Sequence, residues 1–314
     1  MLLALALIPV VVLLIIIYFC DKKEKEPIGL LIGLFFAGAA TIITAIIIEA
    51  IGELILTPFL RSVPAIMKTI FALFIVGPAE ELGKYLVLWL ITWKNKHFDY
   101  SYDAIVYAVF VSLGFACFEN IGYVFSNGFG TAILRMFTAV PGHACFAVFM
   151  GFFYAKAKYS KLTNEKGKFA LFTALSMIVP IIVHGLYDAI IMFGGATGNN
   201  FLAGASLLLW IGFVILMFGA AISVVVFSSK RDFCIIDLPK GEQVVYKPAV
   251  EGLWTCSCGK QCRLNFCTEC GKPRPIGNRW VCPNCGNLAA MNFCGKCGKP
   301  RAVLNSPNQV NNPV

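Results

Sequence analysis

Three charged residues in one apolar segment of the sequence are spaced for joint chemistry. Glu80, Glu81 and Lys84 stand at i,i+3 and i,i+4 spacing, so on a helix the lysine reaches back to either carboxylate. A charged side chain at bilayer depth costs from about 2.5 kcal/mol upward, so such residues usually face a protein interior and carry function. Two adjacent carboxylates at such a place predict general acid–base chemistry on a water molecule or a substrate.

Polar residues in three further apolar segments extend this set. Glu119 and Asn120 are adjacent in one segment, and His143 lies in the next. His184 precedes Asp188 by one helical turn, so the aspartate can orient the imidazole. Glu80, Glu119, His143 and His184 lie at similar depths in the membrane. Counted at 1.5 Å per residue from the predicted cytoplasmic end of each helix, these depths are roughly 18–26 Å. Each group alone has a structural interpretation as an ion pair or a packing contact, but their shared depth predicts one site.

The segments that must position these residues are membrane-spanning helices. The chain is 58% hydrophobic and only 14% charged, with a mean hydropathy of +0.77, against about 25% charged residues in soluble domains. This composition excludes a purely soluble enzyme. Seven segments are long and apolar enough for a span of roughly 20 residues: Leu2–Cys20, Ile28–Ile48, Pro64–Trp93, Tyr102–Phe125, Thr131–Ala155, Phe169–Phe193 and Phe201–Phe227.

The basic residues of the connecting loops predict the orientation of these helices. Lysines and arginines follow the first, third, fifth and seventh segments, whereas the alternate loops hold almost none. Since basic loops stay in the cytoplasm, the N-terminus is expected outside and the C-terminal tail inside. We predict an all-α polytopic bundle over residues 1–233, retained in the cell membrane of a prokaryote, and a linker at 234–251.

The C-terminal region contains an internal repeat of cysteine pairs. Residues 252–301 contain two similar segments with a period of 27 residues over most of their length, the second reading C-x2-C-x8-C-x2-C. Two such pairs supply the four tetrahedral thiolates of a structural zinc ion. We therefore predict tandem zinc ribbons with two Zn²⁺ ions, followed by a disordered tail at 302–314. The predicted ligands are Cys256, Cys258, Cys267, Cys270, Cys282, Cys285, Cys294 and Cys297.

Two questions about this region stay open from the sequence. Cys262 is either a spare thiol or a substitute for Cys256. A disulfide framework is the alternative to zinc, and the predicted cytoplasmic location argues against it because thiols stay reduced there. A closed structural zinc site activates no water, so the ribbons are expected to bind a cytosolic protein or, as the lesser alternative, a nucleic acid.

The membrane motifs resemble those of the PrsW family of intramembrane proteases. Glu80-Glu81-x-x-Lys84, Phe115-x-x-x-Glu119-Asn120 and His184-x-x-x-Asp188 occur in the order typical of that family, which is related to the CAAX prenyl proteases. The resemblance covers about Phe71 to Phe193. It implies an intramembrane endopeptidase whose substrate is a membrane-anchored protein, an anti-sigma factor being the best-known case.

A catalytic hypothesis follows for these residues. Glu80 or Glu81 activates a water molecule, and the other carboxylate with Glu119 holds that water or protonates the leaving amine. His184 is expected to stabilise the oxyanion, with Asp188 orienting the imidazole.

Further residues have supporting roles in this hypothesis. Asn120 is a further donor, Lys84 tunes the glutamate pair, and His143 supports the site. The metal-dependent version has Glu119, His143 and His184 ligate one Zn²⁺, with a glutamate as base.

Two other classes of function remain open from the sequence. Buried carboxylates also serve ion- or proton-coupled transporters and receptors, although the membrane segment has no inverted repeat. A non-catalytic membrane anchor that presents the zinc ribbons is the third reading. An anchor is expected to tolerate substitution of Glu80 and Glu119, whereas an enzyme or a transporter is not.

Overall fold

The computed structural model describes residues 1–235, 254–256, 258–262, 269, 280–281 and 288–289. The chain divides into two units, Met1–Gln243 and Val244–Val314. The first unit is helical, and the described part of the second contains two short hairpins.

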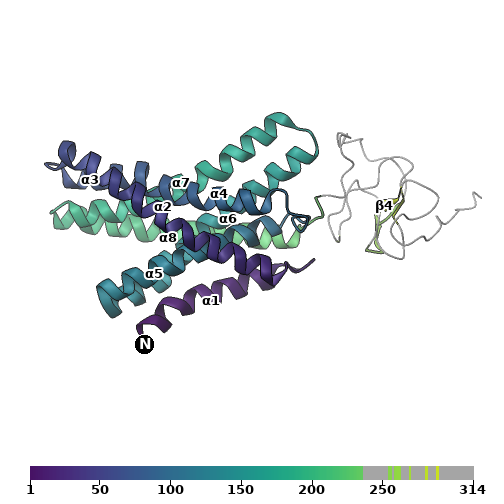
Figure 1. Ribbon diagram of the computed structural model, residues 1–314, viewed down its shortest axis with the longest axis horizontal. Coiled ribbons are helices and arrows are strands. Elements are labelled where there is room, and N and C mark those ends of the chain that lie inside the picture. Colours follow the sequence, from purple (N-terminus) through teal and green to yellow (C-terminus); the bar gives the residue numbers. More distant parts are fainter. Residues whose placement is uncertain (236–253, 257, 263–268, 270–279, 282–287, 290–314) are drawn as a thin grey trace, which may run out of the picture. The chain divides into compact units, whose positions relative to one another are not determined.

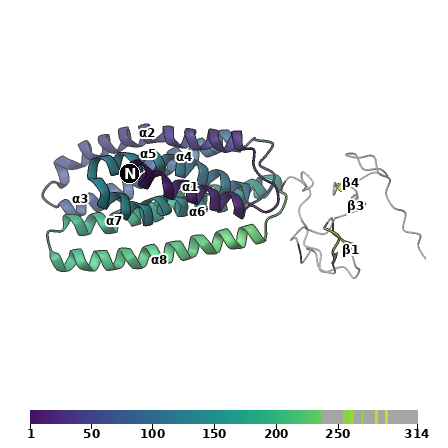
Figure 2. The same cartoon turned by 90° about the horizontal axis from the view of Figure 1, so that it is seen from below.

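The first unit is built from long helices that run roughly along one common direction (Figures 1 and 2). Their bounds are α1 Leu2–Cys20, α2 Ile28–Leu60, α3 Pro64–Phe71, the π-helical turn η1 Ala72–Val76, α4 Gly77–Thr92, α5 Asp103–Phe137, α6 Ala139–Leu162, α7 Lys166–Ala196 and α8 Asn200–Lys230.

Among the residues that the structure describes, five helical stretches are long and apolar enough to cross a membrane. They are Leu2–Cys20, Ile28–Leu60, Asp103–Leu162, Lys166–Ala196 and Asn200–Lys230. The third stretch joins α5 and α6. The predicted third span, Pro64–Trp93, is divided among α3, η1 and α4, the longest of which has 16 residues. A mostly helical membrane protein is therefore confirmed, while the count of seven spans stays a prediction.

Helix α5 forms the centre of the packing, with α2, α1 and α6 against it. Two glycines allow α2 and α5 to approach closely. A Cβ added at Gly38 would overlap the carbonyl oxygen of Val111, and one added at Gly114 would overlap that of Phe35. Because any larger residue would force the two backbones apart, these positions set the distance between the helices.

A turn at the end of α5 changes the predicted position of Arg135. The sequence placed this residue in a span starting at Thr131, together with His143. In the structure, α5 consists of two helical parts, because the backbone leaves the helical conformation at Gly128 (φ 79°, ψ −161°), and the second part ends at Phe137. The chain then turns at Thr138 (φ −124°, ψ −71°) before α6 begins. The break at Gly128 falls between the predicted spans Tyr102–Phe125 and Thr131–Ala155, as expected. The turn at Thr138 was not predicted, and it separates Arg135 from His143.

The loops at one end of the bundle bury a second group of carboxylates, here called the boundary cluster: Asp21, Glu26, Asp103 and Asp232. Asp103 accepts hydrogen bonds from the backbone N–H groups of Asp99 (3.1 Å) and Tyr100 (2.7 Å). Asp232 accepts from the hydroxyl of Ser101 (2.8 Å) and the N–H of Tyr102 (2.9 Å).

The second unit has two antiparallel hairpins, β1 Trp254–Thr255 with β2 Gln261–Cys262, and β3 Trp280–Val281 with β4 Leu288–Ala289. Trp254 pairs with Cys262, and Trp280 pairs with Ala289. In the sequence repeat, Trp254 corresponds to Trp280 and Cys262 corresponds to Ala289, and the first copy is one residue shorter.

Two of the described cysteines in this unit, Cys256 and Cys262, are buried, and Cys258 is exposed. Gly259 has φ +85°, which suits the turn between β1 and β2. The other six predicted zinc ligands lie outside the described residues, as do the predicted tail 302–314 and most of the predicted linker 234–251.

Candidate active site

Helix α4 begins directly after η1 and contains the glutamate pair near its start. Pro78 stands in its first turn, where the missing N–H has no helical partner to lose. Glycines bring this region against α7: a Cβ added at Gly77 would lie 2.9 Å from the carbonyl oxygen of Ile181, and one at Gly185 would lie 3.1 Å from Cα of Leu73. This close approach places Glu81 beside a histidine of α7.

Lys84 is the centre of the charged residues of α4. Its Nζ lies 3.0 Å from Oε2 of Glu80 and 2.8 Å from Oε1 of Glu81, as the helical spacing predicted. It also lies 3.2 Å from Nδ1 of His143 on α6. The ammonium stands 4.1 Å from the ring centroid of Phe115, and the lysine is fully buried.

His184 of α7 lies between two carboxylates. Its Nδ1 is 2.9 Å from Oε1 of Glu81 and 4.0 Å from Oε2 of Glu80, and its Nε2 is 3.2 Å from Oδ2 of Asp188. The ring of Phe146 stacks on the imidazole at 4.5 Å with an interplanar angle of 19°. The aspartate and the phenylalanine together hold the ring in one orientation.

His143 repeats this arrangement from α6. Its Nε2 lies 3.0 Å from Oε2 of Glu119, while Nδ1 faces Lys84. Both imidazoles therefore have a carboxylate on Nε2 and turn Nδ1 toward the charged residues of α4. A carboxylate on the outer nitrogen defines the tautomer and orientation of a histidine, as it does for many metal-binding or catalytic imidazoles.

Arg135 and Asn120 of α5 support Glu119, Asn120 from the same helical part and Arg135 from beyond the break at Gly128. The guanidinium donates to Oε2 of Glu119 (2.6 Å) and to Oδ1 of Asn120 (2.9 Å), and it lies 4.1 Å from the ring centroid of Tyr123. The amide of Asn120 donates to the carbonyl oxygen of Ala6 (3.0 Å). Asn120 was expected to be an oxyanion donor, but the structure commits its amide to α1 and its oxygen to Arg135.

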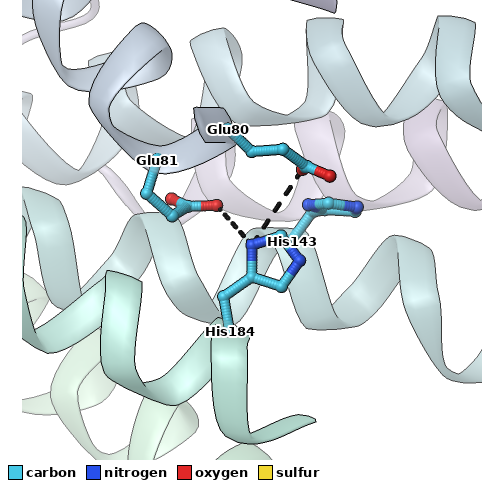
Figure 3. Close-up of side chains that lie close together, drawn as sticks. All are labelled: Glu80, Glu81, His143 and His184. Atoms are coloured by element: carbon cyan, nitrogen blue, oxygen red, sulfur yellow. Dashed lines mark hydrogen bonds and ion pairs between the residues drawn. The ribbon is translucent and has the colours of Figure 1, made fainter. Parts of the chain in front are cut away.

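Four side chains form a compact donor cluster (Figure 3): Glu80, Glu81, His143 and His184. Each offers one ligand atom, and these atoms all lie within 4.8 Å of one another. All four residues are buried. Two carboxylates and two imidazoles form a donor set that suits Zn²⁺. Glu119, which the metal hypothesis had as a ligand, is outside this cluster and contacts it through His143.

A fifth carboxylate near the cluster was missed by the sequence analysis. Glu49 of α2 is half-buried, and Glu80, Glu119 and Asp188 act on it electrostatically. The predicted second span ended at Ile48, one residue earlier, whereas α2 continues to Leu60. The sequence did contain an indication of this residue, because Glu49 is an acidic residue inside an apolar segment that continues beyond it.

The ionic groups around the donor cluster are unbalanced. Leaving out Glu49, which forms no ion pair among the described residues, Glu80, Glu81, Glu119 and Asp188 carry four negative charges when ionised, and Lys84 and Arg135 carry two positive ones. The difference, −2, is left for the two imidazoles or for a bound cation to compensate. Such a site can hold a divalent metal ion, and it can also move protons.

Comparison with known proteins assigns this architecture to a family. Residues 26–221 match the model of the family described as PrsW family intramembrane metalloprotease. The chain is 35% identical over 205 residues to Protease PrsW of Oceanobacillus iheyensis, covering 65% of this chain and 88% of the relative. It is 33% identical to Protease PrsW of Geobacillus kaustophilus (59% of this chain, 76% of the relative) and 33% identical to that of Bacillus subtilis (58% and 79%).

No solved structure matches this chain. The matched residues, 26–221, include every member of the donor cluster and all of its carboxylate partners. The chain therefore belongs to the PrsW family and is an intramembrane protease.

Proposed function

We propose that this peptidase cleaves membrane-anchored proteins at the donor cluster formed by Glu80, Glu81, His143 and His184. The observation that carries the proposal is the convergence of two carboxylates and two imidazoles from α4, α6 and α7 within 4.8 Å, buried inside an apolar bundle. Membership of a peptidase family favours this function over the transporter and anchor alternatives.

Glu81 is the proposed general base. Its Oε1 is held by Lys84 and His184, while its Oε2 is buried and has no hydrogen-bond partner among the described residues. An unpaired buried acceptor is rare in folded proteins and calls for a functional explanation. Oε2 accepts the proton of a water molecule as the water oxygen attacks the peptide carbonyl, and that proton then passes to the leaving amine.

The imidazoles stabilise the intermediate in this scheme. His184 is oriented by Asp188 through Nε2, and its Nδ1–H, which contacts Oε1 of Glu81 before the reaction, turns to the developing oxyanion. His143 is held by Glu119 and keeps Lys84 in contact with both glutamates. Glu80 is the second carboxylate that holds the water or protonates the amine. Asn120 acts indirectly, because it positions Arg135 against Glu119.

The chemistry of the donor cluster also suits the metal ion that the family description implies. Glu80, Glu81, His143 and His184 would hold it, and Glu119 and Asp188 would orient the two imidazoles from outside. A bound divalent ion supplies a Lewis acid that polarises the scissile carbonyl and favours formation of hydroxide. The positioning roles of Glu119 and Asp188 are the same with and without the metal.

Location and partners complete the proposal. The basic loops support an N-terminus outside the cell and a cytoplasmic tail, which places the donor cluster in the outer half of the membrane. A cut at that depth suits a single-span protein such as an anti-sigma factor. The tandem ribbons, each with one Zn²⁺ on four of the eight predicted cysteines, would recruit a cytosolic protein or a nucleic acid. The matching register of the two hairpins supports the repeat.

The test compares membrane-protein fragments released by cells that express the wild-type chain, Glu81→Gln or the control Glu53→Gln. Glu53 lies on α2, where it is exposed and pairs with Lys68. Loss of a positioned base lowers the rate about 10²–10⁴-fold. Fragments present with the wild type and Glu53→Gln are therefore expected to disappear with Glu81→Gln. Full fragment release by Glu81→Gln would overturn the proposal.

A further inference from the structure

The donor cluster already contains a cation that belongs to the chain. The Nζ of Lys84 lies within 3.2 Å of three of the four cluster members: Glu80, Glu81 and His143. A lysine ammonium has three N–H donors and no acceptor. Three acceptors at 2.8–3.2 Å therefore satisfy it completely.

The ammonium and a metal ion would use three of the same side chains. A zinc ion binds carboxylate oxygen and imidazole nitrogen at about 2.0–2.2 Å. Lys84 already contacts one such atom on each of three cluster members, Oε2 of Glu80, Oε1 of Glu81 and Nδ1 of His143, whereas Oε2 of Glu81 has no hydrogen-bond partner among the described residues. Two like charges brought into contact with one set of buried atoms repel each other strongly, because little solvent screens them.

We propose that Lys84 is a built-in competitor for the metal site: a divalent cation binds the donor cluster only when the ammonium withdraws from it. Lys84 then holds three of the four donors together in the metal-free chain and weakens the affinity of the site for metal. The inference concerns the site of the proposed function, but it is tested by metal binding and does not depend on proteolysis.

The alternative is that Lys84 only neutralises Glu80 and Glu81 while a metal binds beside it. The two arrangements predict different changes in metal affinity when the charge of Lys84 is removed. If the ammonium competes, removing its charge strengthens metal binding. If it stands beside the metal, its removal leaves the affinity unchanged or disturbs the glutamates and weakens it.

The experiment measures Mn²⁺ binding by the metal-free, full-length chain in detergent, using the electron paramagnetic resonance signal of free Mn²⁺. Manganese is chosen because it prefers oxygen and nitrogen donors over the thiolates of the C-terminal cysteines. The variants are Lys84→Met, which removes the charge, and Lys84→Arg, which keeps it.

Lys84→Met is expected to bind one Mn²⁺ at least tenfold more tightly than the wild type, and Lys84→Arg to bind like the wild type. Adding His143→Ala and His184→Ala to Lys84→Met is expected to abolish the gain. The proposal fails if Lys84→Met binds no more tightly than the wild type, or if the gain survives the loss of both histidines.

A second pair of variants covers the case in which Lys84→Met does not fold. Glu80→Gln is compared with Glu80→Gln/Lys84→Met, which removes one charge of each sign and keeps Glu81, His143 and His184 as donors. The double variant is expected to bind Mn²⁺ at least tenfold more tightly than Glu80→Gln alone. Equal affinities in this pair would overturn the inference. Proteolysis enters neither comparison, so failure here is separate from failure of the proposed function.

Discussion

The buried carboxylates of the active site and those of the boundary cluster have different kinds of partner. At the active site, Glu80 and Glu81 contact Lys84, and Glu119 contacts Arg135. In the boundary cluster, by contrast, none of the four carboxylates forms an ion pair within the described part of the chain. They accept hydrogen bonds from backbone N–H groups and hydroxyls instead, as Glu26 does from Tyr107 (2.5 Å).

The consequence of this difference is visible in the loop residues. Burial raises the pKa of Asp21 to about 6 and that of Glu26 to about 7. Asp21, Asp103 and Asp232 each keep one buried oxygen without a hydrogen-bond partner. The cations at the active site stabilise the charged form of the carboxylates that contact them. In the boundary cluster, burial without a cation favours the protonated carboxyl group, and its hydrogen bonds hold the loops together.

The largest effect is expected from removing the cation of the active site. Lys84→Met leaves Glu80 and Glu81 buried without their ammonium, and breaking a buried ion pair from one side costs about 3–5 kcal/mol. Denaturant unfolding in detergent should show a loss of this size. Adding Glu80→Gln should recover part of it, because one uncompensated charge is removed. An unchanged unfolding midpoint in Lys84→Met would show that the pairs contribute nothing.

The next effect separates chemistry from stability. Asp188→Asn keeps the shape of the side chain but weakens the orientation of His184, and loss of such a supporting carboxylate costs about 10–100-fold in activity. Fragment release should fall by this factor while the unfolding midpoint stays within the range of the wild type. Asp188 is partly exposed, so little stability depends on it. A wild-type rate of fragment release in Asp188→Asn would contradict a role for Asp188 in orienting His184.

The boundary cluster should behave in the opposite way. Asp232→Ala deprives the hydroxyl of Ser101 and the N–H of Tyr102 of their acceptor. Leaving buried donors unpaired costs about 1–3 kcal/mol each, less any hydrogen bonding to water. Unfolding should therefore occur at lower denaturant, while fragment release per folded molecule stays the same. A selective loss of proteolysis would contradict the comparison.

The smallest effect is a dependence of stability on pH. Glu26 holds its proton more tightly in the folded chain, so the unfolded chain binds fewer protons between about pH 4.5 and 7. Stability should decrease as pH rises through this window and level off above it. Melting temperatures at pH 5 and pH 8 measure the slope. Glu26→Gln should flatten it, whereas Glu24→Gln, at an exposed position of the same loop, should leave it unchanged. An equal slope in both variants would refute the assignment.

Contacts within one helical turn were predictable from the sequence. The i,i+3 and i,i+4 rule predicted that Lys84 reaches Glu80 and Glu81, and that Asp188 reaches the ring of His184. These contacts depend only on the helical period. The shared depth of Glu80 and His184, counted along helices of predicted direction, indicated one site, and the structure brings these residues together with Glu81.

Contacts between helices were harder to predict from the sequence. Counting gives a depth but no rotation about the helix axis, so it left open whether His143 faces Lys84 or Glu119, and in the structure it faces both. The turn at Thr138 was not predicted, so Arg135 was assigned to the span of His143. Its pairing with Glu119 across the break at Gly128 was therefore not expected. Drawing the second span to Ile48 removed Glu49 from consideration.

The amino-acid pattern alone was sufficient to identify an apolar helical protein, the order of its polar motifs and the family they resemble. The assembled site depended on tertiary structure. Gly38 and Gly114 set the distance between α2 and α5, and Gly77 and Gly185 let α4 approach α7. The rotation and separation of helices come from such long-range packing, which no local period encodes, and they decide which nitrogen of a histidine meets which carboxylate.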